Sequence, residues 1–443
     1  MVYDLVIIGF GVSGIAAAKV AKKNKLNFVV IESKETYGGC WNDTFDDTEL
    51  QSDRHYYQFE DFPMPDSYPT YPNKKQILKY LGNVIARFNL TNTIYSSDVT
   101  STVFDKVENR WNIVINRSLK IISKYIIVCS GYYSRNIIPP VFDKLGKIEN
   151  KNDKKDKYDN FEIVHSRDVS SILKTNGGYF DNKNVVIVGN GASCCDILAN
   201  INKKPSKISV IYRSNKYYVD KYIFGISISI VINRFCLQFF RYIPLKLYKL
   251  LFLFANYIFI MNHLNLPDSK INSKNLIGTT IIPRLIKSRR IEYIHGEITD
   301  ISGRDIAVKI IGKEEKQVIL IKDVKNIKEI DIVILATGFS ANLEFIDNSK
   351  KSNNLNIFNI FRYKQVINPY VPNCGFIGLS PSYNWLQMSN KQAEWYITEI
   401  ILKPGNINSN NINMLKEILR YKKMKDSYNL DYNDLTYEMF DSV

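Results

Sequence analysis

The first thirty residues alternate between short apolar runs and a glycine-rich turn. Residues 5–8 (LVII) have the length of a buried parallel strand, and GFGVSG follows directly at 9–14. Residues 15–23 then predict a helix, and the apolar run at 28–31 (FVVI) predicts a second strand. This order of strand, tight turn, helix and strand is typical of the start of a dinucleotide-binding fold.

The three glycines of this turn have different expected roles. Gly9 makes the turn, Gly11 lets the backbone approach a pyrophosphate, and Gly14 lets the helix pack close to the strand. Glu32 ends the second strand, where a carboxylate accepts a hydrogen bond from a ribose hydroxyl and disfavours a 2′-phosphate. The first turn is therefore predicted to bind FAD or NAD rather than NADP.

The same pattern returns in the middle of the chain. The run VVIV at 185–188 is followed by GNGAS at 189–193, and then by a helix and a strand that ends in Arg213. A cation at this place favours a 2′-phosphate and hence NADPH. Cys194 stands at the third glycine position; it is small enough for close helix packing, although the match is imperfect. Two turns with opposite charges at the ribose end predict two different cofactors.

The remaining pattern places these two turns in a larger α/β architecture. Residues 99–127 alternate as in an antiparallel meander, and residues 331–339 predict a buried strand that ends in a glycine turn. Helices are expected at 74–88 and 390–402. We predict an α/β fold with two dinucleotide-binding (Rossmann-like) domains, in which a discontinuous FAD domain (1–170 and 331–443) receives an inserted NADPH domain (171–330), with the active site in the cleft between them.

Residues 222–266 are strongly apolar. The run from Leu250 to Met261 is too short to span a bilayer, and basic residues such as Arg241 and Lys246 interrupt the longer stretch. Buried or partner-facing helices are the favoured interpretation, and an in-plane membrane contact with flanking basic residues is the alternative. We expect a cytoplasmic protein; peripheral membrane association and homodimer formation are left open.

Composition excludes several other classes of function. The 443 residues carry a net charge of +15, but lysines are spread over the whole length and no cluster of basic and aromatic residues indicates a nucleic-acid site. The six cysteines form no CxxC pair and no spacing of metal ligands, so we expect free thiols in a reducing compartment and no metal site. The apolar N-terminus is a strand rather than a signal sequence, because Asp4 precedes it and the glycine turn interrupts it.

Taken together, these segments resemble the flavin-containing monooxygenases, and most closely their plant branch, over nearly the whole chain. The order and spacing of several short motifs carry the resemblance: GFGVSG with Glu32, GGCW at 38–41, LQS at 50–52, QFEDFPMP at 58–65, HSRD at 165–168, GNGAS at 189–193, ATGF at 336–339 and QAEW at 392–395. It implies an FAD- and NADPH-dependent monooxygenase similar to N,N-dimethylaniline monooxygenase. In that chemistry NADPH reduces FAD, the reduced flavin captures dioxygen, and the flavin hydroperoxide transfers one oxygen atom to a soft nitrogen or sulfur nucleophile of a small molecule.

The resemblance also implies roles for the residues at matching positions. FAD would be bound by Gly9, Gly11, Gly14, Glu32, Gly39 and Trp41. NADPH would be bound by Gly189, Gly191, Ser193 and Arg213, and the ATGF match adds Thr337 and Gly338 to the cofactor-binding residues. Gln51 is the catalytic candidate, because it stands where many members have an asparagine near the flavin peroxide and where the plant branch has a glutamine.

One segment departs from the family pattern. Before HSRD, Asp159 and Phe161 replace a phenylalanine and a glycine, and Val169 replaces the aromatic residue that follows. We predict a structural role for His165, because a histidine at a strand end usually satisfies a backbone group. The departure leaves open an NADPH oxidase that releases hydrogen peroxide, and Baeyer–Villiger oxygenation of ketones. Cys194 and the apolar segment leave open a catalytically silent dinucleotide-binding scaffold at a membrane.

Overall fold

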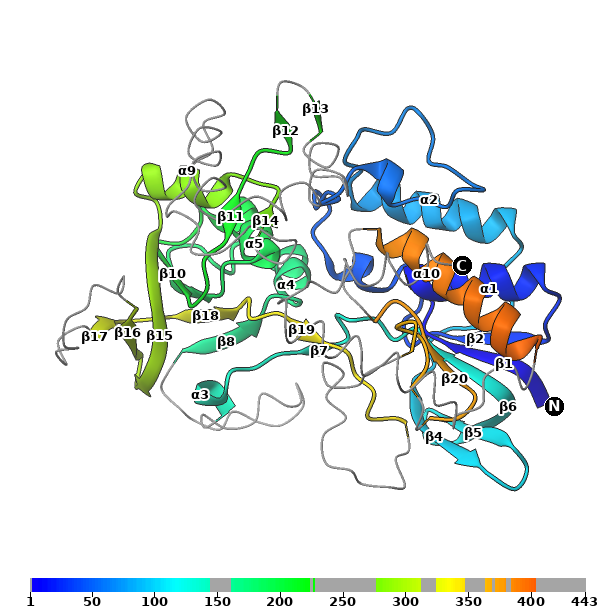
Figure 1. Cartoon of the computed structure of the whole chain (residues 1–443). Coiled ribbons are helices and arrows are strands. Elements are labelled where there is room, and N and C mark those ends of the chain that lie inside the picture. The colour runs from blue at the N-terminus through cyan, green and yellow to red at the C-terminus, as the bar shows by residue number, and fades with distance from the viewer. Residues whose placement is uncertain are drawn as a thin grey trace, which may run out of the picture. The chain divides into compact units, whose positions relative to one another are not determined.

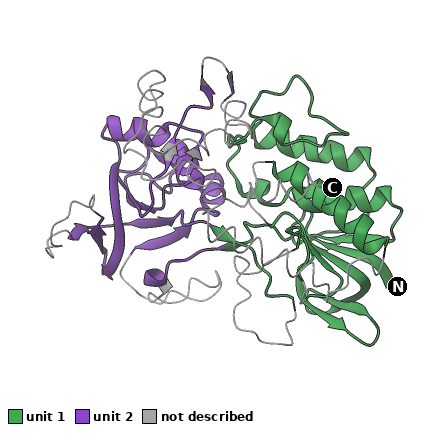
Figure 2. Cartoon of the chain, viewed as in Figure 1, with its two compact units in different colours: residues 1–135, 339–443 green, residues 136–338 purple. Residues whose placement is uncertain are grey.

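The chain forms two compact units, each built around one large sheet (Figures 1 and 2). The computed structural model describes residues 2–143, 161–223, 226–227, 276–311, 324–346, 363–368, 371–379 and 384–403. Unit 1 comprises residues 1–135 and 339–443, and unit 2 comprises residues 136–338.

Seven strands form the sheet of unit 1 within the described ranges: β1 (Val2–Ile8), β2 (Phe28–Ile31), β3 (Thr93–Ile94), β4 (Val99–Asp105), β5 (Arg110–Ile115), β6 (Leu119–Val128) and β20 (Cys374–Phe376). Their order is β3-β2-β1-β6-β5-β4, and β20 also pairs with β6. β6 is long because its first half pairs antiparallel with β5 and its second half pairs parallel with β1 and β20. The predicted meander is thus the antiparallel extension of a parallel dinucleotide-binding sheet.

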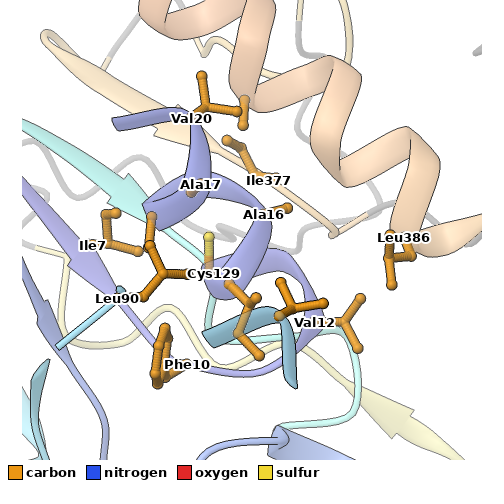
Figure 3. Packing of buried hydrophobic residues seen from close by; sticks show 14 of the residues in the cluster. Ile7, Phe10, Val12, Ala16, Ala17, Val20, Leu90, Cys129, Ile377 and Leu386 are labelled. Carbon is orange, nitrogen blue, oxygen red and sulfur yellow. The ribbon is translucent and has the colours of Figure 1, made fainter. Parts of the chain in front are cut away.

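Three helices cover one face of this sheet: α1 (Val12–Lys23), α2 (Lys74–Arg87) and α10 (Trp385–Tyr396) (Figure 1). Side chains alternate across a strand, so Leu5 and Ile7 of β1 face these helices while Val6 and Ile8 face the opposite core. The helix-side cluster contains Val12, Ala16, Ala17 and Val20 of α1 together with Ile7, Ile377 and Leu386 (Figure 3). The alanines keep α1 narrow, so that α10 packs closely against it.

Seven described strands form the sheet of unit 2: β8 (Glu162–His165), β9 (Asn184–Val188), β10 (Lys207–Tyr212), β15 (Glu292–Ser302), β16 (Asp305–Ile310), β17 (Val324–Ile327) and β18 (Ile332–Leu335). Their order is β17-β16-β15-β10-β9-β18-β8. Here too the sheet is parallel from β15 to β8, and an antiparallel meander extends it through β16 and β17.

Among the described residues, the α-helices of unit 2 are shorter than those of unit 1. They include α5 (Ala192–Ile201), which follows β9, and the single-turn or two-turn helices α3 (Pro140–Asp143), α4 (Val169–Thr175) and α9 (Ile281–Lys287). Two short strands, β11 (Tyr217–Tyr218) and β14 (Leu276–Ile277), pair with each other outside the large sheet. They join positions that lie almost sixty residues apart in the sequence.

The predicted α/β class with two Rossmann-like sheets is confirmed. In each unit the strand of the glycine turn lies between its two parallel neighbours, as β2-β1-β6 in unit 1 and as β10-β9-β18 in unit 2. The chain passes from unit 1 to unit 2 at 135/136 and back at 338/339, so that β8 and β18, which pair with each other, both belong to unit 2. The expected borders of the cofactor domains, at 170 and 330, stay a prediction. The helix predicted at 390–402 is α10, which begins at Trp385 rather than at residue 390, since Leu386 and Met388 already belong to its buried face.

Part of the apolar segment lies inside the described residues. β12 (Tyr222–Ile223) and β13 (Ile226–Ser227) form a small antiparallel pair there. The helical insert was expected at about 222–266, so this pair of strands at its start differs from the prediction. The rest of that range after residue 227 lies outside the described residues, as does the tail after residue 403. Of the helices that the structure describes, none is long and apolar enough to cross a membrane. Membrane contact and dimer formation stay hypotheses.

Candidate functional site

The first glycine turn is fixed by backbone contacts. Gly9 has a φ of +99°, and a Cβ built on it would lie 2.5 Å from the carbonyl oxygen of Cys129 at the end of β6. A Cβ on Gly14 would lie 1.9 Å from the carbonyl oxygen of Gly9. Because real Cβ atoms never come so close to a carbonyl oxygen, both positions require glycine for the fold itself.

The glycine pair of the GGCW segment lies against this turn. Gly39 has a φ of +57°, and a Cβ on it would lie 3.0 Å from the Cα of Gly11. The N–H of Gly38 donates to the carbonyl of Phe10, at 3.0 Å. The structure therefore brings Gly11 and Gly39 together, and the backbone of each is bare where the two approach.

Glu32 is buried beside the same turn, with 4% of its surface exposed. Its carboxylate accepts hydrogen bonds from the N–H of Phe10 (2.5 Å), the N–H of Lys34 (2.9 Å) and the hydroxyl of Ser33 (3.3 Å). A carboxylate has about four acceptor positions, so one remains for a ribose hydroxyl. The acid predicted from the end of β2 thus fits the ribose, and it also stabilises the turn.

In each unit, the helix that follows the glycine turn begins directly after a glycine. α1 begins after Gly11 and α5 after Gly191, and within the described ranges no side chain caps either N-terminus and no acidic residue lies in either first turn. The first N–H groups of a helix have no partner inside the helix and carry a partial positive charge. Both turns therefore fit the pyrophosphate of a dinucleotide.

The loop after Glu32 is held by a small set of contacts. Lys34 donates through Nζ to the carbonyl of Gly39 (3.2 Å) and pairs with Asp43 (2.5 Å). Trp41 is buried, and its indole N–H donates to the hydroxyl of Tyr57 at 2.9 Å. Trp41 therefore supports the loop after Glu32 through its packing, because the only hydrogen-bond donor of its side chain is already bound to Tyr57.

The catalytic candidate, Gln51, is exposed. It follows the buried Leu50, whose N–H donates to the carbonyl of Pro72 at 3.0 Å. It precedes Ser52 and Asp53, which are both buried. Gln51 is thus an exposed residue between buried neighbours in unit 1.

The second glycine turn repeats the geometry of the first. Gly189 has a φ of +111°, and a Cβ on it would lie 2.2 Å from the carbonyl oxygen of Ala336 at the end of β18, as Gly9 lies against Cys129. A Cβ on Gly191, by contrast, would meet no atom of the described chain within 4 Å. The described residues thus leave space beside the Cα of Gly191, which the predicted pyrophosphate site requires.

The charged end of the second site is accessible. Arg213 directly follows β10 and has 76% of its side chain exposed, and its Nη1 lies 3.5 Å from Oε1 of Glu297. An exposed ion pair of this kind is weak, so the guanidinium can turn to a phosphate. Ser193 is half-buried in the first turn of α5. Arg213 and Ser193 belong to the two elements that lead away from β9, as in a dinucleotide site.

Cys194, at the third glycine position, is fully buried, and so is its neighbour Cys195. Burial raises the pKa of both thiols well above the ordinary value, so they stay uncharged. All five described cysteines are free thiols, and the described residues hold no group of His, Cys, Asp and Glu that could bind a metal ion. The prediction of free thiols is confirmed for these five.

Thr337 and Gly338 form the turn after β18. The hydroxyl of Thr337 donates to the carbonyl of Ile137 (2.5 Å), and the N–H of Ile137 donates to the carbonyl of Gly338 (3.1 Å). Gly338 has a φ of +93°, and a Cβ there would meet none of the described atoms within 4 Å. Thr337 therefore holds the turn together, and Gly338 is the more suitable of the two for contact with a cofactor.

His165 ends β8 and is buried. Its Nδ1 accepts from the N–H of Arg167 at 3.3 Å, and burial together with the charge of Arg167 lowers its pKa to about 4. It is therefore neutral at pH 7, which agrees with the structural role predicted for it.

The sequence did not indicate a cluster of tyrosines that contacts the second glycine turn. The hydroxyl of Tyr218 donates to the carbonyl of Asn190 (2.8 Å) and lies 3.2 Å from the hydroxyl of Tyr293. The ring of Tyr293 stacks on Tyr212, with centroids 4.1 Å apart. Since Tyr218 and Tyr293 lie 28 and 103 residues after Asn190, no local pattern reveals these contacts.

Comparison with known proteins places the chain among flavin enzymes. The family profile "Flavin-binding monooxygenase-like" matches residues 3–436. The probable indole-3-pyruvate monooxygenase YUCCA3 of Arabidopsis thaliana is 26% identical over 358 residues, which cover 76% of this chain and 73% of the relative.

Solved structures agree in fold. The open structure of cyclohexanone monooxygenase matches with a TM-score of 0.68 and 16% identity, over 96% of this chain and 93% of that one. A structure of OTEMO in complex with FAD and NADP matches with a TM-score of 0.64 and 14% identity, over 96% and 86% of the two chains. The expected cofactors, FAD and NADPH, are those of the matched family. The chain therefore belongs to the flavin-binding monooxygenase-like family.

Proposed function

We propose that this protein is an NADPH-dependent flavoprotein monooxygenase that transfers one oxygen atom from dioxygen to a small organic substrate. The observation that carries the proposal is the pair of glycine turns with opposite charges, the carboxylate of Glu32 beside the first and the guanidinium of Arg213 beside the second. A carboxylate excludes a 2′-phosphate and a guanidinium binds one, so a single chain with both turns is suited to FAD and NADPH together.

In this proposal unit 1 binds FAD. Gly9 and Gly14 build the turn, Gly11 and Gly39 let two backbone segments approach each other beside the pyrophosphate, and Glu32 accepts a ribose hydroxyl. Trp41 supports the loop through its packing and its bond to Tyr57. The positive N-terminal end of α1 adds a favourable interaction with the pyrophosphate of about 0.3–1 kcal/mol.

Unit 2 binds NADPH in the same manner. Gly189 makes the turn, Gly191 leaves room for the pyrophosphate, and Arg213 pairs with the 2′-phosphate. The hydroxyl of Ser193, in the first turn of α5, is a further donor to the pyrophosphate, and Gly338 ends the neighbouring strand β18.

The chemistry itself belongs to the cofactor. When bound, FAD would supply the redox chemistry by which electrons from NADPH and one molecule of dioxygen yield an oxygen atom for the substrate and a molecule of water. The protein's own task is to orient the reactants and exclude water. We assign to Gln51 the donation of an amide hydrogen bond at the reacting oxygen, because it is an exposed residue between the buried neighbours Leu50 and Ser52.

Two classes of substrate are candidates. The similarity to N,N-dimethylaniline monooxygenase favours a soft nitrogen or sulfur nucleophile. The name of the relative from Arabidopsis thaliana favours an aromatic 2-oxo acid such as indole-3-pyruvate, whose carbonyl carbon is an electrophile. The reacting atom is a nucleophile in the first class and an electrophile in the second. Assays of both kinds of substrate with one enzyme preparation therefore distinguish the two classes.

The test uses purified, flavin-loaded protein with NADPH and oxygenated buffer. Dimethylaniline, a thioether and indole-3-pyruvate are supplied in turn, and NADPH consumption, hydrogen peroxide and oxygenated product are measured. We expect one substrate class to yield close to one product per NADPH. Consumption of NADPH with stoichiometric hydrogen peroxide and no product would identify an oxidase instead, and protein that neither binds flavin nor consumes NADPH would identify a scaffold.

The role of Gln51 is tested in the same assay. Gln51→Ala removes the amide, so we expect product per NADPH to fall and hydrogen peroxide to rise by the same amount. Gln51→Asn is the matched control, because it keeps an amide on a shorter arm and should retain more coupling than the alanine variant. Equal coupling in wild type and Gln51→Ala would remove the assignment.

A further inference from the structure

The second glycine turn is held by a buried tyrosine. Tyr218, in β11, has 1% of its surface exposed, and its hydroxyl donates to the carbonyl of Asn190, the middle residue of the turn, at 2.8 Å. Burial raises the pKa of Tyr218, so its hydroxyl keeps its proton and stays a donor. The bond therefore persists throughout the ordinary pH range.

This bond determines the direction of a second group. A peptide bond is planar and trans, so its carbonyl and its N–H point to opposite sides. Since the carbonyl of Asn190 points to Tyr218, the N–H of Gly191 in the same peptide points away from it. Gly191 is the residue directly before α5, no side chain caps this helix in the described structure, and a Cβ on Gly191 would meet none of the described atoms within 4 Å, so the described chain leaves space beside its Cα.

Asn190 is fixed from its other end as well. Its side chain is buried, and Nδ2 donates to the carbonyl of Ser214 (3.0 Å) and to the hydroxyl of Tyr293 (2.9 Å). The hydroxyls of Tyr293 and Tyr218 lie 3.2 Å apart, and the ring of Tyr293 stacks on Tyr212. One network thus joins the glycine turn to the end of β10, where Arg213 follows.

In unit 1 the corresponding peptide is oriented by a hydrogen bond between two backbone groups. There the middle residue of the turn is Phe10, and its carbonyl accepts from the N–H of Gly38 at 3.0 Å. The N–H of Gly11 consequently points the other way, as that of Gly191 does. The hydroxyl of Tyr218 takes the place in unit 2 that the N–H of Gly38 has in unit 1.

We propose that Tyr218 is a positioning residue for NADPH, which orients the Asn190–Gly191 peptide so that the N–H of Gly191 faces the pyrophosphate. The inference rests on the proposed function of unit 2. It predicts a particular pattern of loss. Because NADP⁺ and NAD⁺ share the pyrophosphate, removal of the Tyr218 hydroxyl weakens both nucleotides equally, while FAD in unit 1 is unaffected.

The test compares Tyr218→Phe with Tyr293→Phe, both as flavin-loaded protein. Binding of NADP⁺ and NAD⁺ is measured by equilibrium dialysis, and bound flavin by absorbance. We expect Tyr218→Phe to weaken both nucleotides about tenfold, the effect of losing one buried hydrogen bond. Tyr293→Phe keeps the bond from Tyr218 to Asn190 and should weaken them less. Tyr218→Met, which also lacks the hydroxyl but adapts its shape, gives the same test if the phenylalanine variant does not accumulate.

Unchanged affinities in Tyr218→Phe would overturn the inference, and so would loss of flavin in proportion to the loss of nucleotide binding. A wild-type protein that binds neither nucleotide would overturn the proposed function of unit 2 itself. The two failures are therefore distinguishable in one experiment.

Discussion

The two units contact their glycine turns with different groups: backbone groups in unit 1, and backbone together with a tyrosine side chain in unit 2. In unit 1 the turn is enclosed by backbone: the carbonyl of Cys129, the Cα of Gly39 and the N–H of Gly38 all lie against it. In unit 2 one side is closed by the carbonyl of Ala336, and another is closed by the hydroxyl of Tyr218. The two turns also differ in the space beside the second glycine: a Cβ on Gly11 would lie 3.4 Å from the Cα of Gly39, whereas a Cβ on Gly191 would meet no described atom within 4 Å.

The helices differ in the same sense. In α1 every residue from Val12 to Ala21 is buried, because α1 packs under α10. In α5 the first two residues, Ala192 and Ser193, are only half-buried. Under the proposed function, an enclosed site suits FAD, which stays bound through many turnovers, and an open site suits NADPH, which must leave after each reduction.

The largest expected effect tests the third glycine position, where the turns differ most. Gly14→Cys gives the first turn the residue of the second, but its Cβ would lie 1.9 Å from the carbonyl of Gly9, so α1 could not pack. We expect little folded protein and no bound flavin. The reverse change, Cys194→Gly, should retain flavin and destabilise unit 2 by about 1–2 kcal/mol, from helix propensity and the lost buried side chain. Flavin absorbance and thermal unfolding measure both; a stable, yellow Gly14→Cys protein would contradict this account of the turn.

The next effect concerns acid, which should loosen unit 2 before unit 1. The pKa of His165 in β8 is lowered to about 4, below its unfolded value of about 6.5. The stability that its neutral form contributes is complete above pH 6.5 and is lost as the pH falls towards 4, because only the unfolded state binds the proton in that range. The loss amounts to about 2–3 kcal/mol.

The corresponding outer strand of unit 1 is β20, and the position in it that matches His165 is Phe376, which does not titrate. The thiol of Cys374, in the same strand, is buried, which raises its pKa, so it is also uncharged in the acid range. Amide hydrogen exchange at pH 7 and pH 4.5 measures each unit separately. We expect protection in unit 2 to fall first, and His165→Asn to reduce the pH dependence of unit 2. A variant with the pH profile of the wild type would show that other groups cause the loss.

The smallest expected effect separates the charges at the two ribose ends. Arg213→Ala should weaken NADP⁺ about tenfold and leave NAD⁺ nearly unchanged, because only NADP⁺ carries the 2′-phosphate. Glu297→Ala is the matched control, since it frees Arg213 from its weak ion pair and should not weaken NADP⁺. Equal loss of both nucleotides in Arg213→Ala would remove the 2′-phosphate argument.

Patterns within short segments predicted the strands, helices and turns whose structure depends mainly on neighbouring residues. The strands and helices next to each glycine turn followed from apolar periodicity, and Gly9 and Gly189 have the positive φ that the turn requires. Glu32 and Arg213 were found because each directly follows a predicted strand.

Contacts between distant segments were beyond such patterns. Only the register of β8 on β18 shows that the segment before the second turn belongs to its sheet, and no local pattern indicates this pairing. Tyr218 and Tyr293 were missed for the same reason: tyrosine is common in this chain, and nothing near either residue indicates Asn190 as its partner.

The most direct test of the central claim, that the two turns bind two different nucleotides, is a pair of matched variants. Gly11→Val and Gly191→Val place the same side chain at the same position of each turn, and bound FAD and NADP⁺ affinity are measured for both. We predict that Gly11→Val lacks FAD and that Gly191→Val retains FAD but no longer binds NADP⁺. A Gly11→Val protein with full flavin content, or a Gly191→Val protein that loses FAD and keeps NADP⁺, would contradict the assignment.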